Sequence, residues 1–238
     1  MNSLRGKTAL VTGGARRLGA AIVRELAMRG ATVLIHYHHS EAEAVTLNRE
    51  LANGGCFLRG DLATDEGREF IFREALGWGG GRIDLWVNNA ARFCPDDASA
   101  AELAVMHAVN VEAPLDFTRW LADAECRGAC VIQVLDARIA RPIGCDPPFA
   151  AYTAGKRELA ASVPRMAAAL AFAGVRVNAV APGDVLPPEA LHEKARPMPL
   201  AVRPSPADVA HAIAFLAEAD PMTGQTLYLD SGFHLLCR

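Results

Sequence analysis

The hydrophobic residues of this chain fall into two alternating patterns. Short runs rich in β-branched or bulky apolar residues lie at 8–12, 31–37, 55–59, 83–88, 129–135, 175–180 and 225–229. Stretches with helical periodicity lie between them, at about 18–29, 41–53, 65–77, 99–124, 151–173 and 206–218. Continuous apolar strands that alternate with helices indicate a parallel sheet covered on both faces. The pattern therefore predicts an α/β fold, doubly wound, with about seven strands.

The length fits one domain. The chain has 238 residues, 51% of them hydrophobic, which is enough to bury a sizeable core. No internal repeat or low-complexity linker divides it, so we expect a single domain over 1–238. The proline-rich stretch 182–206 fits no element. Long loops in compact domains are often lids, so we expect a loop that covers the substrate, with a plain surface excursion as the alternative.

Charge and cysteine usage exclude several classes of function. The net charge of −3 offers no basic excess for binding nucleic acid. No apolar run is long enough to span a bilayer, and no apolar segment with a cleavage site begins the chain, so we expect no membrane association. Cys126 and Cys130 have no partner pair at metal-site spacing, so we expect no metal. These features predict a cytoplasmic protein with reduced thiols.

A glycine-rich turn follows the first predicted strand. The strand at 8–12 runs through Gly13 and Gly14 into a helix that begins near Leu18 and Gly19. The start of a helix has unpaired N–H groups and the positive end of its dipole, so it binds pyrophosphate, and glycines let the backbone approach the anion. Arg17 stands inside this turn.

The end of the second strand suggests which dinucleotide binds. Dinucleotide folds usually place an acid here to hold the ribose 2′-hydroxyl. The segment 36–40 reads HYHHS, and the first acid is Glu41. Histidine and serine side chains can donate hydrogen bonds to a 2′-phosphate, whereas a carboxylate would repel it. His38, His39 and Ser40 therefore predict NADPH rather than NADH. Ser40 could instead be only the N-cap of the next helix.

Tyr152 and Lys156 are candidate catalytic residues. Four residues apart on a helix, they lie on one face. An ammonium near a phenol favours the phenolate and lowers the pKa, so the tyrosine could act as acid or base near neutral pH. The pair alone is common by chance, and an ordinary helix pair is the alternative.

Further motifs complete a family resemblance. They are TGGARRLG at 12–19, DL at 61–62, NNAA at 88–91, Asn110, YTAGK at 152–156 and APG at 181–183. In order and spacing they resemble the short-chain dehydrogenase/reductases over essentially the whole chain. The resemblance implies a Rossmann-type domain, usually a homotetramer, in which Asn110 supports a proton relay, Tyr152 donates the proton and Lys156 holds the cofactor ribose. The cofactor-binding positions it implies, with Asp61 and Leu62 beside the adenine, are Gly13, Arg17, Leu18, Gly19, Asp61, Leu62, Asn88, Ala90, Tyr152, Lys156, Pro182 and Gly183.

Two departures from the family resemble the pteridine reductases. Asp136 stands where the family usually has serine, and Arg17 stands where it usually has glycine. The segments 33–44, 88–95 and 222–236 also look like that subfamily. The resemblance implies that Phe93 stacks on a pterin and that Arg17 contacts both a phosphate and the substrate ring. The interval 137–151 is longer than in that subfamily, and Ser231 replaces a usual glycine.

The chemistry agrees with a pterin-like substrate. Reducing a C=N bond needs a hydride on carbon and a proton on the ring nitrogen, for which Tyr152 and Asp136 are the candidate acids. Phe93 could close a sandwich with the nicotinamide. Alternatively, Phe93 packs in the core and Asp136 caps the turn after its strand.

Three functions are therefore weighed. The first is an NADPH-dependent reductase of pteridines or dihydropteridines, such as dihydrobiopterin or dihydrofolate. The second is a carbonyl or 3-ketoacyl reductase with a structural Asp136, although no serine lies between Ser99 and Ser162. The third is a non-catalytic NADP(H) sensor, which the presence of Tyr152 and Lys156 disfavours.

Overall fold

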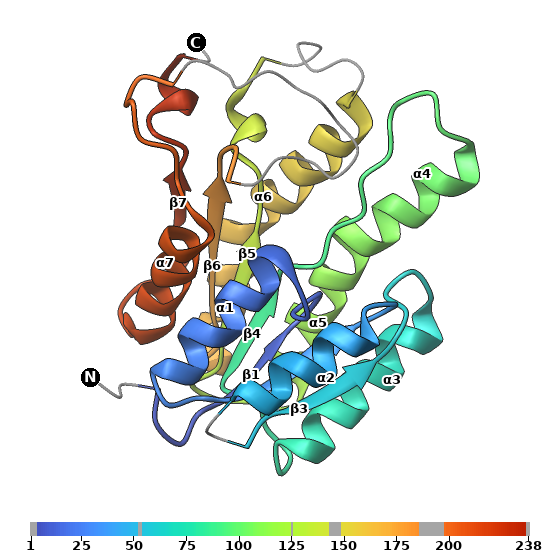
Figure 1. The fold of residues 1–238 in the computed structure, drawn as a ribbon, viewed down its shortest axis with the longest axis vertical. Coiled ribbons are helices and arrows are strands. Elements are labelled where there is room, and N and C mark those ends of the chain that lie inside the picture. Colours follow the sequence, from blue (N-terminus) through green and yellow to red (C-terminus); the bar gives the residue numbers. More distant parts are fainter. Residues whose placement is uncertain (1–3, 52–53, 125, 143–148, 186–197, 237–238) are drawn as a thin grey trace.

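The fold is built on one parallel sheet. A computed structural model describes residues 4–51, 54–124, 126–142, 149–185 and 198–236. Within them, seven strands pair in the order β3-β2-β1-β4-β5-β6-β7, and neighbouring strands are parallel (Figure 1). The strands are β1 (Thr8–Val11), β2 (Thr32–Tyr37), β3 (Cys56–Arg59), β4 (Leu85–Asn88), β5 (Cys130–Val134), β6 (Arg176–Pro182) and β7 (Thr226–Leu229). The sheet confirms the predicted fold class.

Helices cover both faces of the sheet. One core cluster joins the strands to α1, α2 and α7, and a second joins them to α3, α5 and α6. The helices are α1 (Arg17–Met28), α2 (Glu41–Glu50), α3 (Asp65–Trp78), α4 (Ala100–His107), α5 (Ala113–Asp123), α6 (Ala150–Leu170) and α7 (Pro206–Glu218). Trp86 on β4 is fully buried against Phe117 of α5, as expected for a strand covered on both sides.

The stretch at 99–124 differs from the single helix that its periodicity predicts. A capping box formed by Ser99 and Glu102 starts α4. After α4, the chain makes a π-helical turn, η1 (Ala108–Glu112), before α5 begins. Pro114 has no N–H to donate to the carbonyl of Asn110, and a widened turn accommodates the missing bond. The interruption places Asn110 inside the turn.

Two non-glycine residues of the described chain have positive φ angles. They are Arg17 (φ 53°) and Ser231 (φ 56°), the two positions where the family usually has glycine. Ser231 sits at a turn where its carbonyl accepts a hydrogen bond from the Leu200 N–H at 3.0 Å and its hydroxyl donates to the Val202 carbonyl. The strained turn therefore anchors the C-terminal part of the proline-rich stretch.

Part of the predicted lid lies outside the described residues. β6 extends to Pro182, and the description stops at Val185 and resumes at Met198. The prediction of a covering loop at 182–206 therefore stays a prediction. In the part of the chain that is described, no helix combines the length and apolarity needed to cross a bilayer.

Candidate active site

A cleft of about 1040 Å³ opens at the carboxyl ends of the strands. It lies where the strand order reverses between β1 and β4, the place where doubly wound sheets bind ligands. Its walls include most of the residues singled out in the sequence: Gly13, Arg17, Leu18, Gly19, His38, His39, Ser40, Asp61, Leu62, Ala90, Phe93, Asp136, Tyr152, Lys156, Pro182 and Gly183. Asn88 and Asn110 are the predicted site residues that do not line it.

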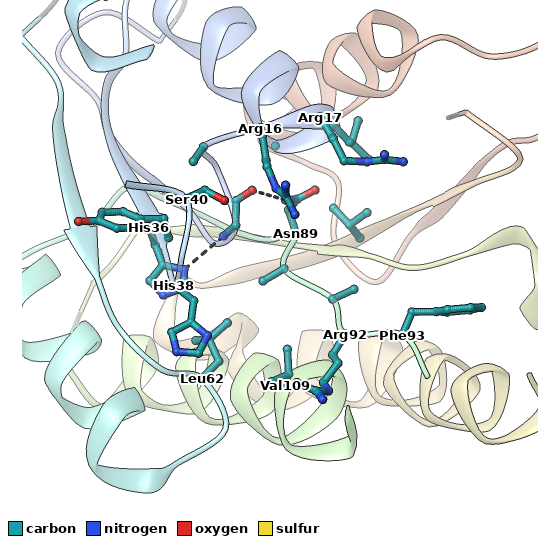
Figure 2. Close-up of a pocket in the computed structure, with 18 of the residues that line it drawn as sticks. Arg16, Arg17, His36, His38, Ser40, Leu62, Asn89, Arg92, Phe93 and Val109 are labelled. Carbon is teal, nitrogen blue, oxygen red and sulfur yellow. Dashed lines mark hydrogen bonds between the residues drawn. The ribbon is translucent and has the colours of Figure 1, made fainter. Parts of the chain in front are cut away.

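The glycine turn brings the start of α1 close to the sheet. Gly13 has a φ of 61°, and a β-carbon on Gly19 would lie 2.1 Å from the Gly13 carbonyl oxygen. Asn89 donates from Nδ2 to the carbonyls of Thr12 and Gly13, at 2.9 and 3.2 Å (Figure 2). The turn therefore needs glycine at both positions for its close packing.

Arg16 and Arg17 extend from this turn into the cleft. Figure 2 shows Arg16 reaching down beside Asn89, while Arg17 lies on the side of the cleft that carries Phe93. A glycine at position 17 would adopt the positive φ without strain, whereas arginine adopts it at a cost. The chain thus keeps a strained backbone at position 17, where the side chain is a long cation that lines the cleft.

The three histidines at the end of β2 lie in different surroundings. His36 is buried, its Nδ1 accepts from the Gly13 N–H at 3.2 Å, and its Nε2 lies 3.2 Å from the Gly60 carbonyl. These two bonds require the neutral ring with a proton on Nε2, and burial lowers the pKa of His36 to about 4. The strand-end histidines are therefore not equivalent: His36 holds the glycine turn and is no phosphate donor.

His38 and His39 remain at the cleft surface. Their ring centroids lie 3.7 Å apart with the ring planes tilted by 34°, and His38 Nε2 is 3.9 Å from a carboxylate oxygen of Asp61. Ser40 occupies the N-cap position of α2, but its side chain makes no capping hydrogen bond. The three residues thus present side-chain donors at one end of the cleft.

The two asparagines that do not line the cleft bond to groups of β4 and of the loop that follows it. Asn88 is buried, and its Oδ1 accepts from Trp86 Nε1 at 3.0 Å. Asn110, in the π-helical turn, exchanges two 2.8 Å hydrogen bonds with the backbone of Arg92. These bonds fix the loop that carries Phe93. The structure thus shows Asn110 as an anchor of this loop, and its part in a proton relay stays a prediction.

A carboxylate and a phenol face each other at the end of β5. The Tyr152 hydroxyl donates to Asp136 Oδ2 at 3.4 Å. The other oxygen, Oδ1, accepts from the Arg138 N–H at 2.8 Å and caps the 3₁₀ turn η2 (Ala137–Ala140). Asp136 therefore caps the turn with one oxygen and faces the tyrosine with the other, and its part in catalysis stays a prediction.

The expected effect of Lys156 on Tyr152 is wrong in this structure. The Lys156 ammonium donates to the Val134 carbonyl at 2.8 Å and lies 5.9 Å from the centre of the Tyr152 ring. Burial and the Asp136 carboxylate instead raise the pKa of Tyr152 well above its usual value. The tyrosine of this structure is thus a weaker acid than an ordinary phenol, and its role as the proton donor stays a prediction. Burial lowers the pKa of Lys156 to about 8.

Aromatic rings form the wall beside this pair. Phe93 is 41% exposed and lines the cleft, with ring centroids 4.4 Å from Phe149 and 4.8 Å from Tyr152. This placement disfavours the alternative that Phe93 belongs to the core. A flat ring bound against it would lie next to the Tyr152 hydroxyl.

Sequence reasoning missed Arg16, which reaches into the cleft, and three further contributors to the site. They are Asn89, which holds the glycine turn; Asp96, whose carboxylate accepts the N–H groups of Ala150 and Ala151 at the start of α6; and Arg138, which follows Asp136. The NN pair at 88–89 pointed to the first, while the other two depend on loops whose paths the sequence did not reveal.

Comparisons with known proteins agree with this geometry. Residues 13–234 match the family model described as enoyl-(acyl carrier protein) reductase. The chain is 30% identical to 3beta-hydroxysteroid dehydrogenase 1 of Eggerthella lenta, over 98% of this chain and 96% of that protein. It is also 30% identical to pteridine reductase 1 of Leishmania tarentolae, over 95% and 96%.

A solved structure extends these similarities to the whole fold. The FolM alternative dihydrofolate reductase 1 from Brucella canis, complexed with NADP, superposes with a TM-score of 0.87 at 30% identity. The match covers 99% of this chain and 96% of that one.

Proposed function

Because the chain belongs to the short-chain dehydrogenase/reductase family, we propose that it is an NADPH-dependent reductase of pteridines or dihydropteridines. The observation that carries the proposal is the Asp136 carboxylate, 3.4 Å from the Tyr152 hydroxyl and beside the exposed face of Phe93. The family usually has a serine hydroxyl at the position of Asp136. A carboxylate suits a substrate whose ring carries N–H groups, because it accepts their hydrogen bonds.

The cleft fits NADPH along its length. The open first turn of α1 suits the pyrophosphate, and Arg16 reaches into the same space. His38, His39 and Ser40 suit a 2′-phosphate, since no carboxylate lies among residues 36–40. NADP in the FolM structure supports the same assignment. When bound, NADPH supplies the hydride.

The residues of the chain then handle the proton. Tyr152 is held protonated, with its hydroxyl hydrogen directed at Asp136, until the ring nitrogen of the substrate replaces that carboxylate as the acceptor. The Lys156 ammonium, which lines the cleft, would hold the ribose of the cofactor. Phe93 orients the substrate ring, and Arg17 binds its polar edge at the mouth of the cleft. Water then returns the proton to Tyr152.

A second candidate is a carbonyl reductase, including one that acts on 3-ketoacyl groups. The similarity to 3beta-hydroxysteroid dehydrogenase 1 favours it, and so does the use of one Asp136 oxygen as a turn cap. In that case the carboxylate has only a structural role. The family resemblance further leads us to propose a homotetramer.

The test separates the effect of the negative charge of Asp136 from the effect of its turn-capping hydrogen bond. NADPH oxidation is followed with dihydrobiopterin, dihydrofolate and a simple β-keto ester, for the wild type, Asp136→Asn and Asp136→Ser. Asparagine retains an oxygen that caps η2 but removes the charge, so it is the matched control. We expect Asp136→Asn to lower kcat/KM for dihydropterins on the order of a hundredfold, with NADPH affinity near that of the wild type. Asp136→Ser should improve the relative use of the keto ester.

Wild-type rates on dihydropterins in Asp136→Asn would contradict the proposal and favour the carbonyl reductase. Tyr152→Phe serves as the positive control in both cases, because either reaction needs its proton. It should cut turnover on the order of a hundredfold with every substrate that the wild type reduces.

A further inference from the structure

Arg138 lies at the junction between the acid pair and the aromatic wall. Its side chain is only 10% exposed, and its Nε lies 4.0 Å from Asp136 Oδ1. The guanidinium carbon lies 5.3 Å from the centre of the Phe149 ring and 6.0 Å from that of Phe93. These distances are typical of cation–π contacts. One cation therefore touches both groups that the proposed reaction needs.

The charges around Asp136 come from several elements. Arg138 approaches it from η2, Tyr152 and Lys156 from α6, and Asp184 from the segment after β6. The pKa of Asp136 is raised overall: burial raises it most, the charges of Arg138 and Lys156 lower it, and the charge of Asp184 raises it. Lys156 has a pKa of about 8 and loses its charge in mildly alkaline solution. An arginine guanidinium, by contrast, is charged throughout the working range of pH.

Other contacts hold the backbone of the turn. Arg157 on α6 donates from Nε to the Ile139 carbonyl at 3.3 Å and from Nη2 to the Arg141 carbonyl at 2.7 Å. The Asp136 cap holds its first residues. The Arg138 side chain can therefore be changed while these bonds keep the turn in place.

We propose that Arg138 is a positioning residue for the reaction: its guanidinium keeps the Asp136 carboxylate charged beside Tyr152 and holds the Phe93–Phe149 wall against the substrate ring. The proposal deepens the proposed function and rests on it. Its two parts depend on different properties of the side chain, because charge acts on Asp136 while the flat guanidinium stacks on the rings.

Two variants separate these parts. Arg138→Met removes the charge but keeps a long apolar side chain against the rings, and Arg138→Lys keeps the charge but replaces the planar group. The experiment measures kcat and KM for dihydrobiopterin between pH 5 and 9, with NADPH affinity as a control.

We expect Arg138→Met to move the acidic limb of the kcat/KM profile up by about one pH unit, because the carboxylate protonates more readily without the cation. Arg138→Lys should keep that limb near the wild-type position and raise KM several-fold. NADPH affinity should stay unchanged in both. If Arg138→Met fails to fold, Arg138→Gln carries the same charge test.

Superimposable pH profiles for the charge-removing variant and the wild type would overturn the electrostatic part. An unchanged KM in Arg138→Lys would overturn the stacking part. Failure of the proposed function is distinguishable, since the wild type would then reduce only the β-keto ester.

Discussion

Replacing Arg17 with glycine should make the protein more stable and its proposed reaction slower. Arg17 has a φ of 53°, in the left-handed region where a β-carbon is strained. At the same time its side chain lines the cleft on the side of Phe93. Backbone and side chain therefore have opposite effects, and the substitution separates them.

The size of the stability change follows from two opposing terms. The left-handed conformation costs a non-glycine residue roughly 1–2 kcal/mol. Glycine offsets about 0.5–1 kcal/mol of this gain, because a chain with glycine has more conformational freedom to lose on folding. The net gain is about 0.5–1 kcal/mol, which for a chain of this size raises Tm by about 2 °C.

Arg17→Ala is the matched control. Alanine loses the guanidinium and every contact it makes, as glycine does, but it keeps the strained β-carbon. Thermal unfolding of both variants should therefore place glycine about 2 °C above alanine. In steady-state assays the two should agree, with kcat/KM lowered for dihydropterins, a modest loss of NADPH affinity and any activity on a β-keto ester retained.

The predicted change in stability and the predicted change in activity can be refuted separately. Equal melting temperatures for the glycine and alanine variants would refute the backbone strain. Equal losses on dihydropterin and keto ester, or no loss on either, would refute contact between Arg17 and the substrate.

Two further predictions concern the cofactor and the lysine. Wild-type protein should bind NADPH more tightly than NADH in a fluorescence titration, and the double change His39→Asp with Ser40→Ala should weaken NADPH far more than NADH; equal wild-type affinities would refute the assignment. The pKa of Lys156 is lowered to about 8, so the cationic form is lost as pH rises through that value, and kcat/KM should fall above about pH 8; a profile that stays level to pH 10 would show that the ammonium is dispensable.

The sequence predicted the sheet well because a buried parallel strand leaves a clear pattern. All seven apolar runs became strands, since each must be apolar on both faces. The helix at 99–124 was harder, because a π-helical turn changes the register of a helix without changing its composition. Pro114 was the available signal for this turn, because proline has no N–H to donate. Its effect on the helix depends on which backbone carbonyl is left without a hydrogen-bond donor.

The candidate site was predictable in its residues but less so in its electrostatics. Spacing placed Tyr152 and Lys156 on one helix face, but it could not show that the ammonium would bond to the Val134 carbonyl. The direction of the Tyr152 pKa depends on that partner and on Asp136, which comes from another element. The role of His36 in holding the glycine turn was not predicted, because a buried histidine pairs its ring nitrogens with groups from other elements, whose positions the sequence does not show.

The departures from the family were informative at the level of the backbone. Arg17 and Ser231 were noted as replacements of usual glycines, and among the described residues they are the non-glycine positions with positive φ. A residue that stays in a strained conformation is often kept for a function of its side chain. At Ser231 the side chain bonds to the Val202 carbonyl, and at Arg17 it lines the cleft.

The central claim is that the wild-type cleft reduces a pteridine ring with NADPH. The measurement that tests it most directly is the ratio of kcat/KM for dihydrobiopterin or dihydrofolate to kcat/KM for a simple β-keto ester, from NADPH oxidation by the wild-type protein. The Asp136–Tyr152 pair beside Phe93 predicts a ratio well above one for at least one of the two dihydropteridines. A ratio below one for both would contradict the account and identify the protein as a carbonyl reductase.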